Sequence, residues 1–193
     1  MDGCGVLLYR GNKQGGDAMN EQELIKSIKN GDRLAMDALI ESYYQSVFSY
    51  FYRNIGDYHQ SKDLTQEVFI KMVVNISRYQ RRTEFKNWLF TIASNHLKNY
   101  WRYAARHPST KLDPDEYAEG AGIENEITQK ISIQQAMAQL QNEQKDAVIL
   151  RFYHDFKISE IAKITDAKES TVKARIRYGL EKLERILEVS DHE

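Results

Sequence analysis

Apolar side chains recur every three to four residues through most of this chain, which is the period of an amphipathic α-helix. The period starts at Glu21, and the break Asn-Ile-Gly-Asp at 54–57 separates the first long helical pattern from the second. The apolar stripes of the three predicted long helices are Tyr43, Val47 and Phe51 with Tyr44, Phe48 and Tyr52 beside them; Leu64, Val68, Met72 and Ile76; and Leu89, Ile92, Ala93, Leu97 and Tyr100. No strand-like alternation competes over a useful length, and the 193 residues include only two prolines. The pattern therefore predicts an all-α fold.

The same pattern predicts two small helical domains joined by a tether. Residues 1–19 hold five of the ten glycines and no helical period, so we expect a disordered extension there; Met19 is a plausible alternative start. The first domain is expected over 20–107. Both prolines lie in 108–126, which predicts a flexible linker. The helical period returns at Ile127, and the second domain is expected over 127–190.

Charge is segregated along the chain although the formal net charge is only −1. Residues 71–107 carry eight basic side chains against the single acid Glu84, whereas 108–127 carry six acidic side chains against the single base Lys111. Because salt screens charges beyond about 8–10 Å, each of these segments acts locally. The tether is therefore an acidic linker, and it follows directly on a strongly basic segment.

Residues 158–172 fit two short helices that cross at a tight turn, as in a helix-turn-helix motif. Ser159 is expected to cap the first helix, and the small Ala162 allows the second helix to cross closely. The expected shared core is Ile161, Ile164, Val172 and Ile176. Asp166 stands at the turn position where such motifs usually have glycine, but aspartate tolerates the left-handed conformation better than most residues do. The following basic helix would enter the major groove of DNA; the alternative is a helical hairpin with a solvated basic face.

Seven aromatic residues lie among the basic residues of 79–103. Cations neutralise phosphates and aromatic faces stack on unpaired bases, so this mixture favours single-stranded or distorted nucleic acid. Trp88 and Phe90 are more readily explained as core residues. Asn95, Asn99 and Arg102 are spaced i, i+4, i+7, so they share one helix face that could contact bases or phosphates.

Four short stretches of the chain resemble parts of one known protein family. Residues 63–69 (DLTQEVF) and 85–95 (FKNWLFTIASN) look like the conserved region two of extracytoplasmic-function (ECF) sigma factors of bacterial RNA polymerase. Residues 159–162 (SEIA) and 170–175 (STVKAR) look like their region four. The resemblance covers about 20–188 with both regions in order, and it implies a factor that directs the polymerase core to promoters and promotes DNA opening.

The resemblance also implies roles for particular residues. Asp63, Gln66, Glu67 and Phe69 would dock on the clamp helices of the largest polymerase subunit, although Phe69, like Leu64, could instead belong to the core. The residues expected at the minus-ten element are Arg78, Arg81, Arg82, Asn95, Lys98, Asn99 and Arg102. Those expected at the minus-thirty-five element are Thr171, Lys173, Ala174, Arg175, Arg177 and Tyr178, with Thr171 and Arg175 also candidates for packing. The linker would thread a positively charged polymerase channel, or it simply solubilises the tether.

Other function classes find less support. No catalytic motif, phosphate-binding glycine loop or metal-ligand spacing of the five histidines is present, so we expect no enzyme activity, metal or cofactor. With one cysteine, Cys4, and no membrane-length apolar run, a cytoplasmic protein without membrane insertion is expected. The expected partners are RNA polymerase core (clamp helices and flap region), promoter DNA and, from the resemblance, an anti-sigma factor. The rivals are a stand-alone helix-turn-helix regulator and an RNA-binding or termination-control protein.

Overall fold

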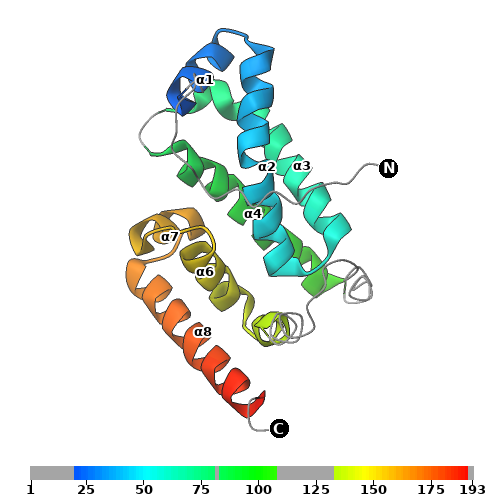
Figure 1. Cartoon of the computed structure of the whole chain (residues 1–193), viewed down its shortest axis with the longest axis vertical. Coiled ribbons are helices and arrows are strands. Elements are labelled where there is room, and N and C mark those ends of the chain that lie inside the picture. Colours follow the sequence, from blue (N-terminus) through cyan, green and yellow to red (C-terminus); the bar gives the residue numbers. More distant parts are fainter. Residues whose placement is uncertain (1–19, 81–82, 108–132, 191–193) are drawn as a thin grey trace, which may run out of the picture. The chain divides into compact units, whose positions relative to one another are not determined.

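The computed structural model describes residues 20–80, 83–107 and 133–190, and every regular element in these ranges is a helix. The chain divides into two compact units, residues 1–39 and 40–193. The elements (Figure 1) are α1 (Glu21–Lys29), α2 (Arg33–Ile55), α3 (Tyr58–Asn75), the 3-10 helix η1 (Ile76–Arg78), α4 (Phe85–Arg106), α6 (Asn142–Phe152), α7 (Ile158–Thr165) and α8 (Glu169–Ser190), and residues 133–138 are also helical. The predicted all-α fold is confirmed. The expected extension (1–19) and acidic linker (108–126) lie outside the described residues.

The first unit is built around α1, whose start is determined by a reciprocal cap. The Asn20 side chain accepts a hydrogen bond from the Gln22 backbone N–H (3.4 Å), and Glu23 Oε2 accepts one from the Asn20 N–H (3.1 Å). Such a capping box satisfies N–H groups that have no partner inside the helix. Asp32 serves the start of α2 in the same way, because its Oδ1 accepts from the Ala35 N–H (3.2 Å).

The predicted break at 54–57 separates α2 from α3. Gly56 has a φ of +82°, and its N–H donates to the Tyr52 carbonyl (2.8 Å), so it closes α2 in the left-handed conformation that glycine adopts without strain. Asp57 then caps α3 by accepting a hydrogen bond from the Gln60 N–H (2.9 Å). The local sequence thus dictates both the end of one helix and the start of the next.

Helices α2 (from Ile40 on), α3 and α4 form a bundle whose core includes members of each predicted stripe, whereas Tyr52 of the first stripe is exposed. The fully buried side chains at its centre are Val47, Phe51, Val68, Met72, Phe85, Leu89, Phe90, Ala93 and Leu97. Aromatic contacts join the three helices: Tyr44 stacks on Phe69 (ring centroids 6.0 Å apart), and Tyr43 meets the edge of Phe85 (5.4 Å). The prediction that Phe90 is a core residue is confirmed.

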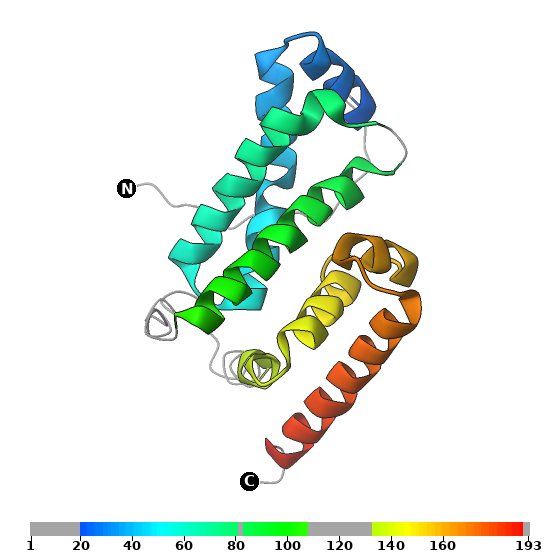
Figure 2. The same cartoon turned by 180° about the vertical axis from the view of Figure 1, so that it is seen from behind.

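Helices α6, α7 and α8 form the second domain, in which α8 packs along α6 and α7 (Figure 2). Its core includes Ile161, Ile164 and Val172 as predicted, whereas Ile176 is only half-buried. The turn between α7 and α8 uses Asp166 in the left-handed conformation (φ 51°, ψ 54°), and the Ala167 N–H donates to the Ala162 carbonyl (2.9 Å). The helix-turn-helix geometry therefore forms without a glycine.

One predicted cap is wrong. Ser159 lies inside the first turn of α7, and the capping residue is Lys157, whose backbone N–H donates to Glu160 Oε2 (2.7 Å). The glutamate three residues after the cap binds back to the cap N–H, so α7 starts at Ile158 and its cap lies two residues before Ser159. The sequence predicted a cap at Ser159 because serine is common at the N-cap position of helices.

Candidate nucleic-acid and polymerase interfaces

The C-terminal half of α4 presents a polar face of the predicted spacing. Asn95, Asn99 and Arg102 are all exposed. Arg102 donates from Nη2 to Asn99 Oδ1 and from Nε to the Lys98 carbonyl (3.4 Å). These bonds hold the guanidinium along the helix surface, where it remains exposed to solvent. Such a face offers amide groups and a cation within about two turns, which are the groups that bind base edges and phosphates.

Lys98 has a different environment from the other predicted minus-ten residues. It is half-buried, and its Nζ donates to the carbonyl of Thr165 at the end of α7 (2.6 Å). Burial lowers the pKa of the Lys98 amine, against the opposing effect of the Asp146 and Asp166 carboxylates. The structure therefore separates Lys98 from the exposed face formed by Asn95, Asn99 and Arg102.

The segment before α4 supplies the remaining predicted minus-ten residues. Arg78 is exposed at the end of η1, while Arg81 and Arg82 lie outside the described residues. Tyr79 is buried, and its hydroxyl donates to the Thr83 carbonyl (2.6 Å), so both ends of this loop are anchored. Trp88 is half-buried against Tyr79 (5.2 Å between ring centroids) and Phe85 (5.5 Å), which gives it a packing role.

Helix α8 carries the second predicted DNA-contacting set. Its members Thr171, Lys173, Arg177 and Tyr178 are exposed, whereas Ala174 and Arg175 are half-buried. Arg177 lies over the Tyr178 ring (4.6 Å from Cζ to the centroid) and 3.8 Å from Glu181 Oε1. Both contacts are solvent-exposed and therefore weak, so the guanidinium can exchange them for a base or a phosphate.

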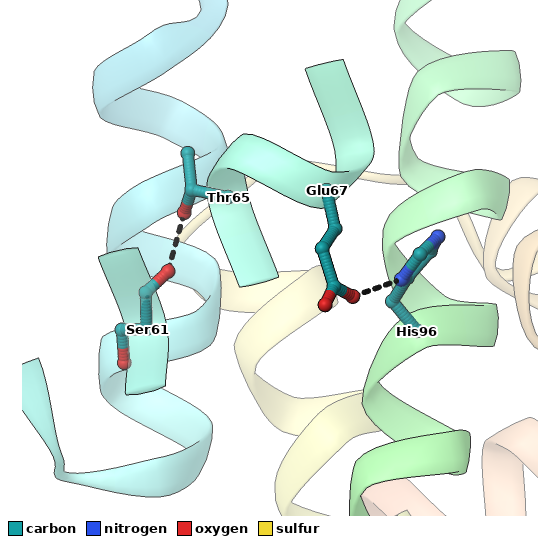
Figure 3. A network of polar contacts seen from close by, with 4 residues as sticks. All are labelled: Ser61, Thr65, Glu67 and His96. Atoms are coloured by element: carbon teal, nitrogen blue, oxygen red, sulfur yellow. Dashed lines mark hydrogen bonds and ion pairs between the residues drawn. The ribbon is translucent and has the colours of Figure 1, made fainter. Parts of the chain in front are cut away.

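Helix α3 carries the predicted polymerase-docking residues. Asp63, Gln66 and Glu67 are exposed, and Glu67 Oε2 lies 3.0 Å from His96 Nδ1 of α4 (Figure 3). In the same view Thr65 faces away from this pair and donates to the Ser61 carbonyl (2.6 Å). The acidic residues thus form one exposed face of the helix.

Phe69, the apolar member of the predicted docking set, is buried against Tyr44 and is only 6% exposed. The apolar side chains that α3 does expose are Ile70 (65%), Val73 (43%) and Val74 (69%). Sequence reasoning missed these three residues. The available signal was that 68–74 is apolar at nearly every position, which is more than one buried face of a helix can accommodate.

Sequence reasoning also missed a set of buried polar residues. Tyr50 donates from its hydroxyl to Asp146 Oδ1 (2.7 Å), and both residues are almost fully buried. Burial raises the pKa of Asp146 to about 6, although the Tyr50 hydrogen bond and the charges of Lys98 and Arg175 act in the opposite direction. Burial lowers the pKa of His154 to about 3, assisted by Lys86 and Arg53. No local sequence pattern predicts these groups, because their partners are distant in sequence.

No group of three or more histidine, cysteine, aspartate or glutamate side chains suited to a metal ion occurs within 20–80, 83–107 and 133–190. Among the helices that the structure describes, none has the length and apolar character needed to cross a membrane.

Comparison with known proteins identifies both domains. Residues 39–107 match the family Sigma-70 region 2, and residues 130–183 match Sigma-70, region 4. The ECF RNA polymerase sigma factor SigW of Bacillus subtilis is 28% identical over 182 residues, which cover 84% of this chain and 94% of that protein. The ECF RNA polymerase sigma-E factor of Escherichia coli is 29% identical over 175 residues, covering 83% and 90%.

Solved structures share the fold. The sigma factor RpoE of Bartonella quintana, in complex with the anti-sigma factor NepR, superposes with a TM-score of 0.63 at 18% identity, covering 85% of this chain and 98% of that one. CnrH, in complex with the cytosolic domain of CnrY, superposes with a TM-score of 0.65 at 17% identity, covering 88% and 97%. With both regions matched in order over most of its length, the chain belongs to the ECF sigma factors, which direct promoter-specific transcription initiation.

Proposed function

We propose that this sigma factor binds RNA polymerase core through α3 and contacts the promoter at two places, with α4 at the minus-ten element and α8 at the minus-thirty-five element. One observation carries the assignment: two exposed faces rich in amide, hydroxyl and basic groups stand on helices of the two sigma domains, Asn95, Asn99 and Arg102 on α4 and Lys173 and Arg177 on α8. A factor that binds DNA at two sites needs two such faces.

The proposed docking surface combines charge with apolar area. Asp63 and Glu67 supply an acidic edge beside the neutral Gln66, and Ile70 and Val74 supply exposed apolar side chains on the same helix. Positions 63, 67, 70 and 74 are separated by four, three and four residues, so they form one stripe along α3. An acidic rim beside an apolar centre suits a partner helix with a basic surface, and charge complementarity would orient the encounter.

The work of this factor is binding, with no bond chemistry of its own. Unstacking a base costs a few kcal/mol, and in this proposal polymerase and promoter contacts together offset that cost. Specific DNA binding therefore requires the core enzyme. We place this activity in the cytoplasm with the polymerase. An anti-sigma factor is the expected regulator, since the similar RpoE and CnrH structures are complexes with such partners or with a partner's cytosolic domain.

Run-off transcription tests the proposal. Purified core polymerase is combined with this protein and with templates drawn from its transcription start sites mapped after overexpression. We expect start-site-specific transcripts only when protein and core are both present, and a gel shift of the same DNA only with core. Operator-like binding by the protein alone would favour the stand-alone regulator, and absence of any stimulation by the protein would refute the proposed function.

A further inference from the structure

A histidine of α4 is bonded to one of the acidic side chains proposed to dock on the polymerase. His96 Nδ1 lies 3.0 Å from Glu67 Oε2 of α3 (Figure 3). An ionised carboxylate offers only acceptor atoms, so the histidine is the donor and its Nδ1 carries the proton. The contact is therefore an N–H···O hydrogen bond directed from α4 to α3.

Both partners of this hydrogen bond stand on backbone that the bundle core holds in place. Glu67 is followed in α3 by Val68, and His96 is followed in α4 by Leu97; both of these apolar side chains are fully buried. Helices α3 and α4 pack directly against each other. The bond thus joins two rigid elements, which is the arrangement that holds a functional side chain most precisely.

The two partners differ in their exposure to solvent. The His96 side chain is 22% exposed, whereas the Glu67 side chain is 57% exposed. The imidazole is the anchored partner, and the carboxylate stays open to a second partner arriving from solvent. Exposed pairs of this kind contribute little to the free energy of folding. The main effect of the bond is therefore on the orientation of Glu67.

Glu67 also has a competing partner on its own helix. Lys71 is exposed and follows Glu67 by four residues, the spacing at which glutamate and lysine pair on a helix surface. In the part of the chain that the structure describes, Glu67 pairs with His96 and forms no ion pair with Lys71. Lysine would neutralise the carboxylate with a full positive charge, whereas a neutral imidazole donates a hydrogen bond and leaves the negative charge in place.

We propose that His96 is a positioning residue for polymerase docking, which holds the Glu67 carboxylate in one orientation for the core enzyme without neutralising it. A free glutamate on a helix surface samples many rotamers, and ordering such a side chain on binding costs part of the interaction free energy. The hydrogen bond from His96 removes part of that cost before core arrives. The inference deepens the proposed function and rests on its assignment of α3 as the docking surface.

Affinity for core polymerase, measured without DNA, tests this role. Cys4 is the only cysteine, so the native chain can be labelled there with fluorescein and titrated with core by fluorescence anisotropy. Leaving out DNA separates the effect from the neighbouring Asn95, which is assigned to the promoter. His96→Leu keeps a side chain of similar size and removes the donor, so the Kd should rise about three- to ten-fold. An unchanged or lower Kd would overturn the inference.

Further variants distinguish orientation from packing. His96→Asn places an amide N–H on the atom bonded to Cγ, where Nδ1 stands in histidine, so its Kd should stay within about two-fold of wild type. His107→Leu removes an exposed histidine just after the same helix and is the matched control, with no expected change. A weakened His96→Asn, or an equal loss in His107→Leu, would overturn the inference. If His96→Leu fails to fold by circular dichroism, His96→Ala removes the same donor and takes its place.

A double-mutant cycle tests whether His96 acts through Glu67. Glu67→Gln removes the charge that His96 orients, so adding His96→Leu to this variant should raise the Kd no further. Full additivity of the two substitutions would mean that His96 acts independently of Glu67 and would overturn the inference.

The proton on Nδ1 can also be observed directly. The full chain is labelled with nitrogen-15 histidine, and the His96 signals are identified by their loss in His96→Asn. At mildly alkaline pH the Nδ1 of His96 should have the chemical shift of a protonated nitrogen, whether the ring is neutral or charged. An unprotonated Nδ1 would show that the hydrogen bond to Glu67 does not form and would overturn the inference without any use of polymerase.

The same titrations separate this inference from the proposed function. Wild-type protein that does not bind core, or a Glu67→Gln variant that binds as tightly as wild type, would refute the assignment of α3 as the docking surface. Weaker binding of Glu67→Gln together with unchanged binding of His96→Leu would leave that surface intact and overturn only the role of His96.

Discussion

The pH dependence of stability offers a sharp test of the buried groups, because Asp146 and His154 act in opposite directions. In the folded protein the Asp146 carboxyl has a pKa of about 6 instead of 3.8. The unfolded chain therefore releases this proton first as pH rises, and the free energy of unfolding falls between pH 3.8 and 6. The shift corresponds to about 3 kcal/mol.

For His154 the sign is reversed. Its pKa is about 3 in the folded protein instead of 6.5, so the unfolded chain takes up a proton first as pH falls. The free energy of unfolding therefore falls between pH 6.5 and 3, by about 5 kcal/mol in total. Between about pH 4 and 6 the two contributions have equal and opposite slopes, and we expect them to cancel in the wild-type protein.

Single substitutions separate the two contributions. Asp146→Asn leaves only His154, so stability should drop by about 3 kcal/mol from pH 6 to pH 4 relative to wild type. His154→Phe keeps a ring against Phe90 and leaves only Asp146, so relative stability should rise over the same interval. Urea unfolding followed by circular dichroism at several pH values measures the differences, in which all other titrating groups cancel. If both variants ran parallel to wild type, the assigned burial of these groups would be wrong.

Four further predictions concern the interfaces and the core. Arg177→Ala should reduce discrimination between minus-thirty-five sequences by about 1–3 kcal/mol if the side chain contacts a base. If competition transcription shows an equal loss of activity on all sequences, Arg177 contacts only phosphate. Asn99→Ala should bind core normally but open promoters poorly, and unchanged permanganate reactivity of the minus-ten thymines would exclude this role. Glu67→Lys should weaken core binding by placing like charges together, measured by pull-down against Glu188→Lys as control; equal retention of both would remove α3 from the docking surface. Phe156→Ala should lower the free energy of unfolding by about 3–5 kcal/mol by leaving a cavity. A loss below about 1 kcal/mol, measured by urea unfolding, would mean that the packing of Phe156 contributes little to stability.

Much of the candidate site is predictable because it depends on helix period alone. Asn95, Asn99 and Arg102 share a face wherever that helix packs, since residues three and four apart on a helix are neighbours. Asp166 could be placed at a left-handed turn because few other residues tolerate that conformation there. The apolar face formed by Ile70, Val73 and Val74 was not identified, because periodicity alone does not say which of two apolar stripes the bundle covers.

The sequence by itself determined the helices, their order and the grouping into two sigma domains, because these follow from local spacing, capping residues and motifs. It also predicted which residues contact DNA. Only the tertiary structure decided that Lys98 is tied to the Thr165 carbonyl and that Tyr50 lies against Asp146, 96 positions away. A contact between side chains so distant in sequence depends on how two folded surfaces meet, and no local pattern contains that information.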